Sequence, residues 1–210
     1  MNILHIDASA RTTGSVSRDL SQRFLNHLEA EGLALNIDRL DLAATPPSHV
    51  TELMTAGMYT APDQRTPAMM EALAESDRLC DRVLAADAIV CGLPMYNFGM
   101  PSAFKALIDN IVRGGRTFEA SETGFVGQLA DTKAAFLITS GMDYTPSSPT
   151  ASMDGLTPHL RTVFGLVGIV EPDIIHSQPM SFYGHQATAE VEAAAIRDIK
   201  QTAKAWADAA

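Results

Sequence analysis

The sequence predicts an α/β protein built on a five-stranded parallel sheet with helices on both faces. Short apolar runs alternate along the 210 residues with longer segments that repeat their apolar residues every three or four positions. The run at 87–93 has no polar alternation, which is typical of a strand buried on both faces. Because the strand-like runs alternate with helical segments, a parallel sheet is favoured over an antiparallel one.

The first strands and helices follow directly from the amino end. Residues 2–8 form a strand-like run, and apolar residues at every fourth position predict a helix over 16–28. A second strand is expected at 34–42. Residues 43–66 are rich in Pro, Thr and Ala, and they indicate a long surface segment with one short helix near 50–57.

The middle of the chain repeats the pattern. Apolar residues from Met69 to Leu84 predict a helix, and the strand at 87–93 should end at Pro94. The apolar residues of 104–112 form one face of an amphipathic helix. The pair Gly114-Gly115 is expected to close that helix.

The last third supplies the remaining elements. We expect a strand at 132–140, a helix at 156–167, a strand at 169–177 and an Ala-rich helix at 186–208. No internal repeat, heptad pattern or linker divides the chain. One domain over 1–210 is therefore expected, which at this length buries about 70% of its unfolded surface.

Composition excludes several classes of protein. Asp and Glu number 25 against 15 Lys and Arg, and this net charge of −10 argues against binding to nucleic acid. No apolar run approaches the ~18 residues of a membrane span. The first residues lack the basic region of a secretory signal, and Cys80 and Cys91 lie in apolar stretches. No metal-ligand spacing is present. A cytoplasmic protein that binds neither membrane nor metal is expected.

The segment after the first strand is a candidate phosphate site, because ligands of open parallel sheets bind beyond the carboxyl ends of the strands. Residues 9–17 carry five hydroxyl side chains and lead into a helix, whose first N–H groups and dipole favour an anion. Neither a Gly-rich dinucleotide fingerprint nor a P-loop is present. The alternative is ordinary helix capping by Ser15 or Ser17, and Arg11 reaches either the phosphate or the solvent.

The segment after the third strand is a candidate surface for a flat ligand. Met95, Tyr96, Asn97 and Phe98 lie between two prolines, so they form a stiff apolar wall that also carries polar groups. Such a wall suits a planar aromatic ring. The alternative is an aromatic loop that fills the core beneath the next helix.

The segment after the fourth strand of the sheet completes the set. Thr139, Ser140 and Gly141 could let the backbone approach the same ligand, although a plain turn explains them equally well. All three segments are expected at one edge of the sheet. A phosphate site beside a surface for a planar ring predicts a site for flavin mononucleotide (FMN).

The sequence resembles the FMN-dependent NADH azoreductases, which are also quinone reductases. The matching residues keep the order and spacing of that family from residue 2 to the last helix. They are Ser9 with Ser15-Val16-Ser17, Pro94-Met95-Tyr96-Asn97-Phe98, Lys105 through Asp109, Thr117-Phe118, Gly127, Lys133, Thr139-Ser140 and Leu166-Val167-Gly168-Ile169. The resemblance implies a flavodoxin-like fold with strand order 2-1-3-4-5. It also implies a homodimer that binds one noncovalent FMN per subunit near the dimer interface.

The resemblance assigns a part of FMN to each segment. The ribityl phosphate would be held by Ser9, Ser15, Val16 and Ser17. The isoalloxazine ring would lie against Met95, Tyr96, Asn97 and Phe98, with its other edge at Ser140, Gly141, Met142 and Asp143. Two departures affect the substrate range. Met142-Asp143 replaces the usual Gly-Gly pair, and Ala120 stands where some members carry an aromatic residue.

The implied reaction is ping-pong hydride transfer carried by FMN, with no catalytic side chain required. NADH would reduce the cofactor, and a quinone or azo compound would then take two electrons at the same face. The sequence leaves open the physiological acceptor and the choice between NADH and NADPH. One alternative is a flavodoxin-type electron carrier without a nicotinamide site. Another is a flavin-free binding or hydrolytic domain.

Overall fold

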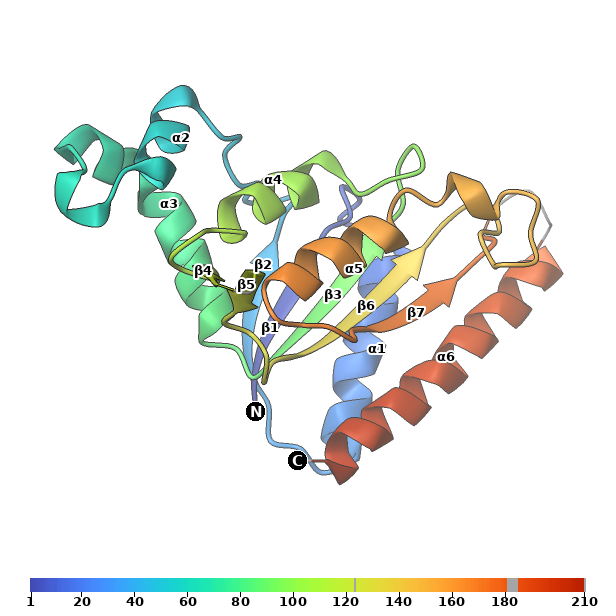
Figure 1. Ribbon diagram of the computed structural model, residues 1–210. Coiled ribbons are helices and arrows are strands. Elements are labelled where there is room, and N and C mark those ends of the chain that lie inside the picture. Colours follow the sequence, from blue (N-terminus) through green and yellow to red (C-terminus); the bar gives the residue numbers. More distant parts are fainter. Residues whose placement is uncertain (123, 181–184, 210) are drawn as a thin grey trace.

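A five-stranded parallel sheet lies at the centre of the computed structural model, which describes residues 1–122, 124–180 and 185–209 (Figure 1). Its strand order is β2-β1-β3-β6-β7, which confirms the expected order 2-1-3-4-5 when the strands of this sheet are numbered alone. The strands are β1 (Asn2–Asp7), β2 (Asn36–Asp41), β3 (Ala88–Pro94), β6 (Lys133–Thr139) and β7 (Asp173–Ser177).

Helices cover both faces of this sheet, as the sequence predicts (Figure 1). One face packs against α1 (Val16–Ala30) and α6 (His185–Asp208). The other face packs against α3 (Pro67–Leu84), α4 (Ser102–Ile111) and α5 (Thr157–Leu166). The expected short helix is α2 (Glu52–Tyr59), and short 3-10 turns cover Pro62–Gln64 and Ala151–Met153. Within the described residues, no helix is both long and apolar enough to cross a membrane.

The core consists of one apolar layer on each face of the sheet. Every residue of β3 is buried, as its unbroken apolar run predicts. On one face Phe24 of α1 meets Trp206 of α6 edge to face, with ring centroids 5.0 Å apart. On the other face Phe136 and Phe164 lie 4.7 Å apart. Burial of each such ring contributes about 1.5–3 kcal/mol, so the two layers hold the strands in a fixed register.

The parallel register brings the carboxyl ends of the strands to one edge, the upper edge in Figure 1. Asp7 of β1 lies opposite Asp41 of β2 and Gly92 of β3. Further along the sheet, Thr139 of β6 lies opposite Pro94 on one side and Ser177 on the other. The segments that follow these strands therefore begin side by side.

An antiparallel hairpin is the main element that the sequence did not predict. It pairs β4 (Phe118–Ser121) with β5 (Gly124–Gly127) outside the central sheet. Most of its side chains are exposed, so it lacks the buried apolar alternation by which strands are recognised. A Cβ on Gly127 would lie 2.1 Å from the backbone nitrogen of Gly168, so only glycine allows this close approach to the end of α5.

Strand β3 ends at Pro94 as expected, with Pro94 itself as its last paired residue, a position that needs no N–H donor. Two other element boundaries differ from those expected. Helix α4 ends at Ile111, before the glycine pair, and Thr117 Oγ1 donates to the Ile111 carbonyl oxygen there. Strand β7 begins at Asp173, directly after a proline, and not at 169.

Candidate functional site

The segments after β1, β3 and β6 enclose a cavity of about 240 Å³ at the carboxyl edge of the sheet. Its lining residues are Ser9, Arg11, Ser15, Val16, Pro94, Met95, Tyr96, Thr139, Ser140, Gly141 and Met180. The structure thus brings seven of the residues expected at the site into one cavity. The expected residues outside the lining are Ser17, Asn97, Phe98, Met142 and Asp143.

The wall after β1 ends in the amino terminus of α1. Ser15 is the N-cap residue, but its side chain makes no capping hydrogen bond and lies 3.3 Å from Ser17 Oγ. The Ser15 side chain therefore does not cap the helix, contrary to the alternative interpretation. The first backbone bond of the helix runs from Asp19 N–H to the Ser15 carbonyl oxygen. The N–H groups before Asp19 have no acceptor within the helix and remain available to an anion.

An ion-pair cluster beneath this wall fixes its position. Arg18 donates to both carboxylate oxygens of Asp41, at 2.8 and 2.6 Å, and to the Ser9 carbonyl oxygen at 2.9 Å. Asp7 Oδ2 lies 3.3 Å from the same guanidinium. The hydrogen bonds from Arg18 lower the pKa of Asp41 to about 2, whereas burial raises the pKa of Asp7. Arg18 therefore joins α1 to the ends of β1 and β2.

His5 forms a buried relay under the same helix. Arg39 can only donate, so its hydrogen bond to His5 Nδ1 at 2.9 Å requires that nitrogen to be unprotonated. His5 Nε2 then donates to Ser21 Oγ at 2.9 Å, and Ser21 Oγ donates to the Arg18 carbonyl oxygen at 3.0 Å. Burial and the two arginines lower the pKa of His5 to about 4. This histidine is neutral at pH 7 and serves the packing of α1.

The wall after β3 ends in a tight turn. Tyr96 and Gly99 exchange backbone hydrogen bonds of 2.9 and 3.0 Å, and Asn97 and Phe98 have φ angles of 47° and 67°. Two successive left-handed residues define a type I′ turn, which is strained for non-glycine residues. The Phe98 carbonyl oxygen accepts from the Gly155 N–H at 2.9 Å, which anchors the turn.

The aromatic side chains of this turn face outward. Tyr96 is 36% exposed and Phe98 44% exposed, so the alternative of a loop that fills the core is wrong. The Tyr96 hydroxyl accepts a hydrogen bond of 3.3 Å from the Ala10 N–H. The turn thus bridges to the segment after β1 and leaves aromatic surface open beside the cavity.

The wall after β6 is held by its own hydrogen bonds. Ser140 is buried, and its Oγ lies 2.8 Å from the Met142 carbonyl oxygen and 2.9 Å from Gln178 Oε1. The Asp143 carboxylate accepts from the N–H and the hydroxyl of Thr145, at 2.9 and 3.1 Å. Asp143 therefore turns into its own loop and away from the cavity.

Two lining residues, Pro94 and Met180, were not expected to contact the ligand, whereas contacts from Thr139 and Arg11 were considered. Pro94 and Thr139 are the last residues of β3 and β6. Met180 follows β7, and the Met180 N–H donates to the Ser140 carbonyl oxygen at 2.9 Å. The shared edge of parallel strands was the signal that could have found Met180.

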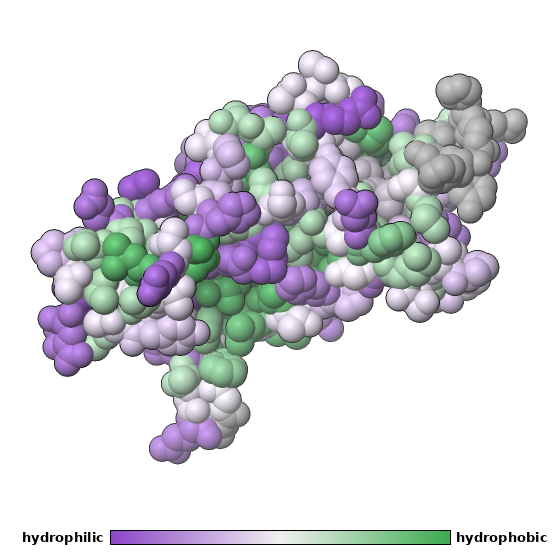
Figure 2. Space-filling view, turned by 90° about the horizontal axis from the view of Figure 1, so that it is seen from above, coloured by the Kyte–Doolittle hydropathy of each residue, from purple (hydrophilic) through white to green (hydrophobic). Residues whose placement is uncertain are grey.

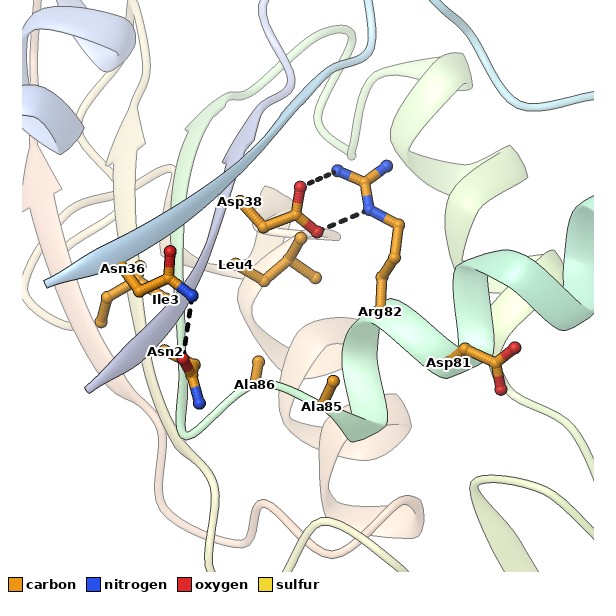
Figure 3. Close-up of a pocket in the computed structure, with 9 residues that line it drawn as sticks. All are labelled: Asn2, Ile3, Leu4, Asn36, Asp38, Asp81, Arg82, Ala85 and Ala86. Atoms are coloured by element: carbon orange, nitrogen blue, oxygen red, sulfur yellow. Dashed lines mark hydrogen bonds and ion pairs between the residues drawn. The ribbon is translucent and has the colours of Figure 1, made fainter.

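A second cavity, of about 400 Å³, lies at the opposite edge, where β1 and β2 begin (Figure 3). Its polar side chains already have partners, among them Arg116 for Asp81. Arg82 donates to both carboxylate oxygens of Asp38 at 2.8 Å, and Asn36 Nδ2 donates to Asn2 Oδ1 at 3.0 Å. Because these groups are satisfied, this cavity offers a ligand little to bind, and the carboxyl edge is the candidate site.

Comparisons with known proteins agree with the fold. Residues 1–204 match a family model described as flavodoxin-like fold. "FMN-dependent NADH:quinone oxidoreductase 2" of Trichormus variabilis is 39% identical over 206 residues, which cover 98% of this chain and 99% of the relative. "FMN-dependent NADH:quinone oxidoreductase" of Nostoc punctiforme is 40% identical over 199 residues, 94% of this chain and 97% of the relative.

Solved structures of similar shape come from more distant proteins. The azoreductase AzrA superposes with a TM-score of 0.89 at 24% identity, over 97% of this chain and 99% of that one. An FMN-dependent NADH-azoreductase from Bacillus anthracis, solved in complex with FMN, gives 0.86 at 22% identity, over 99% of this chain and 100% of that one. At these identities the two likenesses establish the fold alone.

Proposed function

This chain belongs to the flavodoxin-like family of FMN-dependent NADH:quinone oxidoreductases, and from that premise we propose that it performs their reaction. It uses NADH to reduce quinones by two electrons and to cleave azo compounds reductively. The observation that carries this proposal is the cavity in which a hydroxyl-rich helix terminus faces an aromatic turn. Relatives that match nearly the whole chain are named as enzymes, which favours an enzyme over an electron carrier.

The residues of the cavity fit the two ends of FMN. Ser9, Ser15 and Ser17 offer hydroxyl donors beside the free N–H groups of α1, beginning at Val16, and these hold the phosphate. A Cβ on Gly92 would lie 2.5 Å from the Ser17 carbonyl oxygen, so glycine lets this terminus sit against β3. When bound, FMN supplies the ring that accepts and donates hydride.

The remaining site residues orient the ring. Met95, Tyr96, Asn97 and Phe98 give it one apolar wall, and the anchored turn keeps that wall fixed before the ligand arrives. The backbone of Ser140, Gly141, Met142 and Asp143 meets its other edge, without the Asp143 carboxylate. NADH and the acceptor use the same open face in turn, beside the exposed rings of Tyr96 and Phe98. No side chain acts as acid or base.

A homodimer with the site near its interface completes the proposal. Figure 2 looks down on the carboxyl edge and shows hydrophobic side chains gathered in several places between hydrophilic ones. Large apolar residues are exposed on α2, α3 and the hairpin: Leu53, Tyr59, Met70, Phe125 and Val126. A partner subunit would cover them. Cys80 and Cys91 are free and buried, which supports a cytoplasmic location.

Initial-rate kinetics test the proposed reaction. NADH oxidation is measured at several fixed concentrations of a benzoquinone, and then of an azo dye, with FMN-loaded protein. We expect FMN-dependent turnover with both acceptors and parallel double-reciprocal lines, since one face serves both substrates in turn. Lines that intersect would reject the shared face, and absence of turnover with every quinone would reject the function.

A further inference from the structure

The cavity has one positively charged side chain among its described lining residues. Of the described residues that line the cavity, Arg11 is the charged one, and the others are apolar, hydroxyl-bearing or glycine. A chain with a net charge of −10 repels an anionic phosphate at long range. A local cation would offset this repulsion and add to the hydrogen bonds from the α1 terminus.

Arg18 is close to the same segment but is not available for this role. Its guanidinium already donates to both oxygens of Asp41 and to the Ser9 carbonyl oxygen. Asp7 lies 3.3 Å away on the same group. One guanidinium facing two carboxyl groups leaves no positive charge for a ligand, so Arg18 shapes the segment without neutralising a phosphate.

Arg11 has the opposite character. Its backbone N–H donates to Ser9 Oγ at 3.2 Å, which fixes the main chain at the start of the loop. A Cβ on Gly14 would lie 3.3 Å from Arg11 Nη2, so the side chain folds back over the loop that leads into α1. Within the described residues its guanidinium makes no hydrogen bond or ion pair. Its five N–H donors are free at the mouth of the cavity.

We propose that Arg11 binds the phosphate of the flavin from the solvent side and gives the site its preference for FMN over riboflavin. This inference rests on the proposed function. A guanidinium forms paired hydrogen bonds with phosphate oxygens, and these complement the donors of the α1 terminus. Arg11 is thus a specificity-determining residue that the serine motif alone does not reveal.

Flavin titrations test the role of Arg11. Apoprotein is titrated with FMN and with riboflavin, which lacks the phosphate, and binding is followed by flavin fluorescence. In R11Q we expect FMN to bind about 10- to 100-fold more weakly, because a charge-assisted hydrogen bond is lost. The affinity for riboflavin should be unchanged. R11K should bind FMN more tightly than R11Q but more weakly than the wild type. Raising the ionic strength should reduce the difference in FMN affinity between wild type and R11Q.

Arg23→Gln is the matched control. Arg23 lies on α1, the helix that follows the Arg11 loop; it is exposed and pairs with Asp19 at 2.6 Å, so its loss changes the net charge equally without touching the cavity. R23Q should bind both flavins as the wild type does. The rate of FMN release after dilution of holoprotein gives a second reading that needs no apoprotein, and it should rise in R11Q alone.

Three results would overturn the assignment. If R11Q weakened FMN and riboflavin equally, Arg11 would serve the fold and not the phosphate. If FMN affinity were unchanged while the KM for NADH rose, Arg11 would bind the dinucleotide instead. In both cases wild-type protein still binds FMN and the proposed function stands. If wild-type protein bound no FMN, the function and this inference would fail together.

Discussion

Single residues beneath the site decide how firmly the amino end of α1 is held. Arg18, Asp41 and the Ser9 carbonyl oxygen form one charged cluster, and His5 and Ser21 form a neutral relay beside it. The side chains of Arg18, Asp41, His5 and Ser21 do not line the cavity. Both sets therefore affect the site by holding the amino end of α1 in place. Buried polar groups do this only when each has its hydrogen-bond partners.

His5 makes the stability of the protein depend on pH. Its pKa falls from 6.5 to about 4 in the folded protein, so the unfolded chain binds more protons between these values. Its contribution is complete above pH 6.5 and is lost as pH falls toward 4. This amounts to about 3 kcal/mol at most. Urea unfolding at pH 7.5, 6, 5 and 4 measures the loss.

The variant His5→Gln isolates this contribution. Asp7 has the opposite sign, because its raised pKa makes the folded state gain stability as pH falls, and it is present in both proteins. We expect H5Q to lose less stability than the wild type as pH falls from 6.5 to 4. Parallel profiles would mean that His5 is not the titrating group.

The sequence predicted the identity of most site residues but not their conformation. The prolines around Met95 indicated a stiff wall, yet nothing in the sequence indicates two left-handed residues at Asn97 and Phe98, because bulky residues rarely adopt that conformation. Asp143 was expected at the ring edge. Its hydrogen bonds with Thr145 turn its carboxylate away from the cavity. Such local hydrogen bonds compete with contacts to a ligand, and the order of residues in the sequence does not reveal them.

Among the elements, the contact between α1 and β3 sets the place of the phosphate site. A Cβ on Gly92 would lie 2.5 Å from the Ser17 carbonyl oxygen and 2.9 Å from Ser21 Oγ. The sequence shows a glycine inside a buried strand, but only the structure shows which helix approaches it. Close backbone approach is the reason that a strand tolerates glycine here.

Gly92→Ala should therefore move α1 away from the sheet. We expect a loss of about 1–3 kcal/mol of stability from overpacking, together with weaker FMN binding, because the N–H groups of α1 are displaced. Gly165→Ala on α5 is the control, since its Cβ would meet nothing within 4 Å and alanine favours a helix. Urea unfolding and flavin titration of both variants provide the comparison. An unchanged FMN affinity in G92A would show that the position of α1 is not critical.

The elements of the central sheet were predictable and the hairpin was not. Long apolar periods such as 16–28 and 87–93 predicted α1 and β3, because buried elements impose their period on the sequence. The hairpin β4–β5 is exposed, and its one aromatic contact joins Phe118 to Phe125 at 5.5 Å. An element that does not contribute to the core leaves little periodic signal in the sequence.

At the scale of the whole molecule, the exposed hairpin bears on assembly. Phe125 is 65% exposed, and we expect Phe125→Ser to weaken self-association while the stability of the single chain changes little. Val170→Ser is the control, because Val170 is 73% exposed but lies between α5 and β7, outside the hairpin. Sedimentation over a range of protein concentrations measures the shift. If F125S and the wild type had the same oligomeric state, the hairpin would not be part of the interface.

The arrangement of the whole chain turns separate sequence segments into one site. Alternating strands and helices predicted a parallel sheet, and a parallel sheet places the residues after β1, β3 and β6 at the same edge. The strand order itself came from the family resemblance, because alternation alone does not specify which strands are neighbours. The structure adds Met180, which follows β7, to the cavity lining.

The central claim is that this cavity holds a flavin that NADH reduces. The most direct measurement is the visible absorption of the FMN-loaded protein when it is mixed with NADH in the absence of oxygen and acceptor. We expect one equivalent of NADH per flavin to bleach the band of the oxidised cofactor, and a quinone added afterwards to restore it. A protein that takes up no FMN, or one whose bound FMN stays oxidised in excess NADH, would contradict the account.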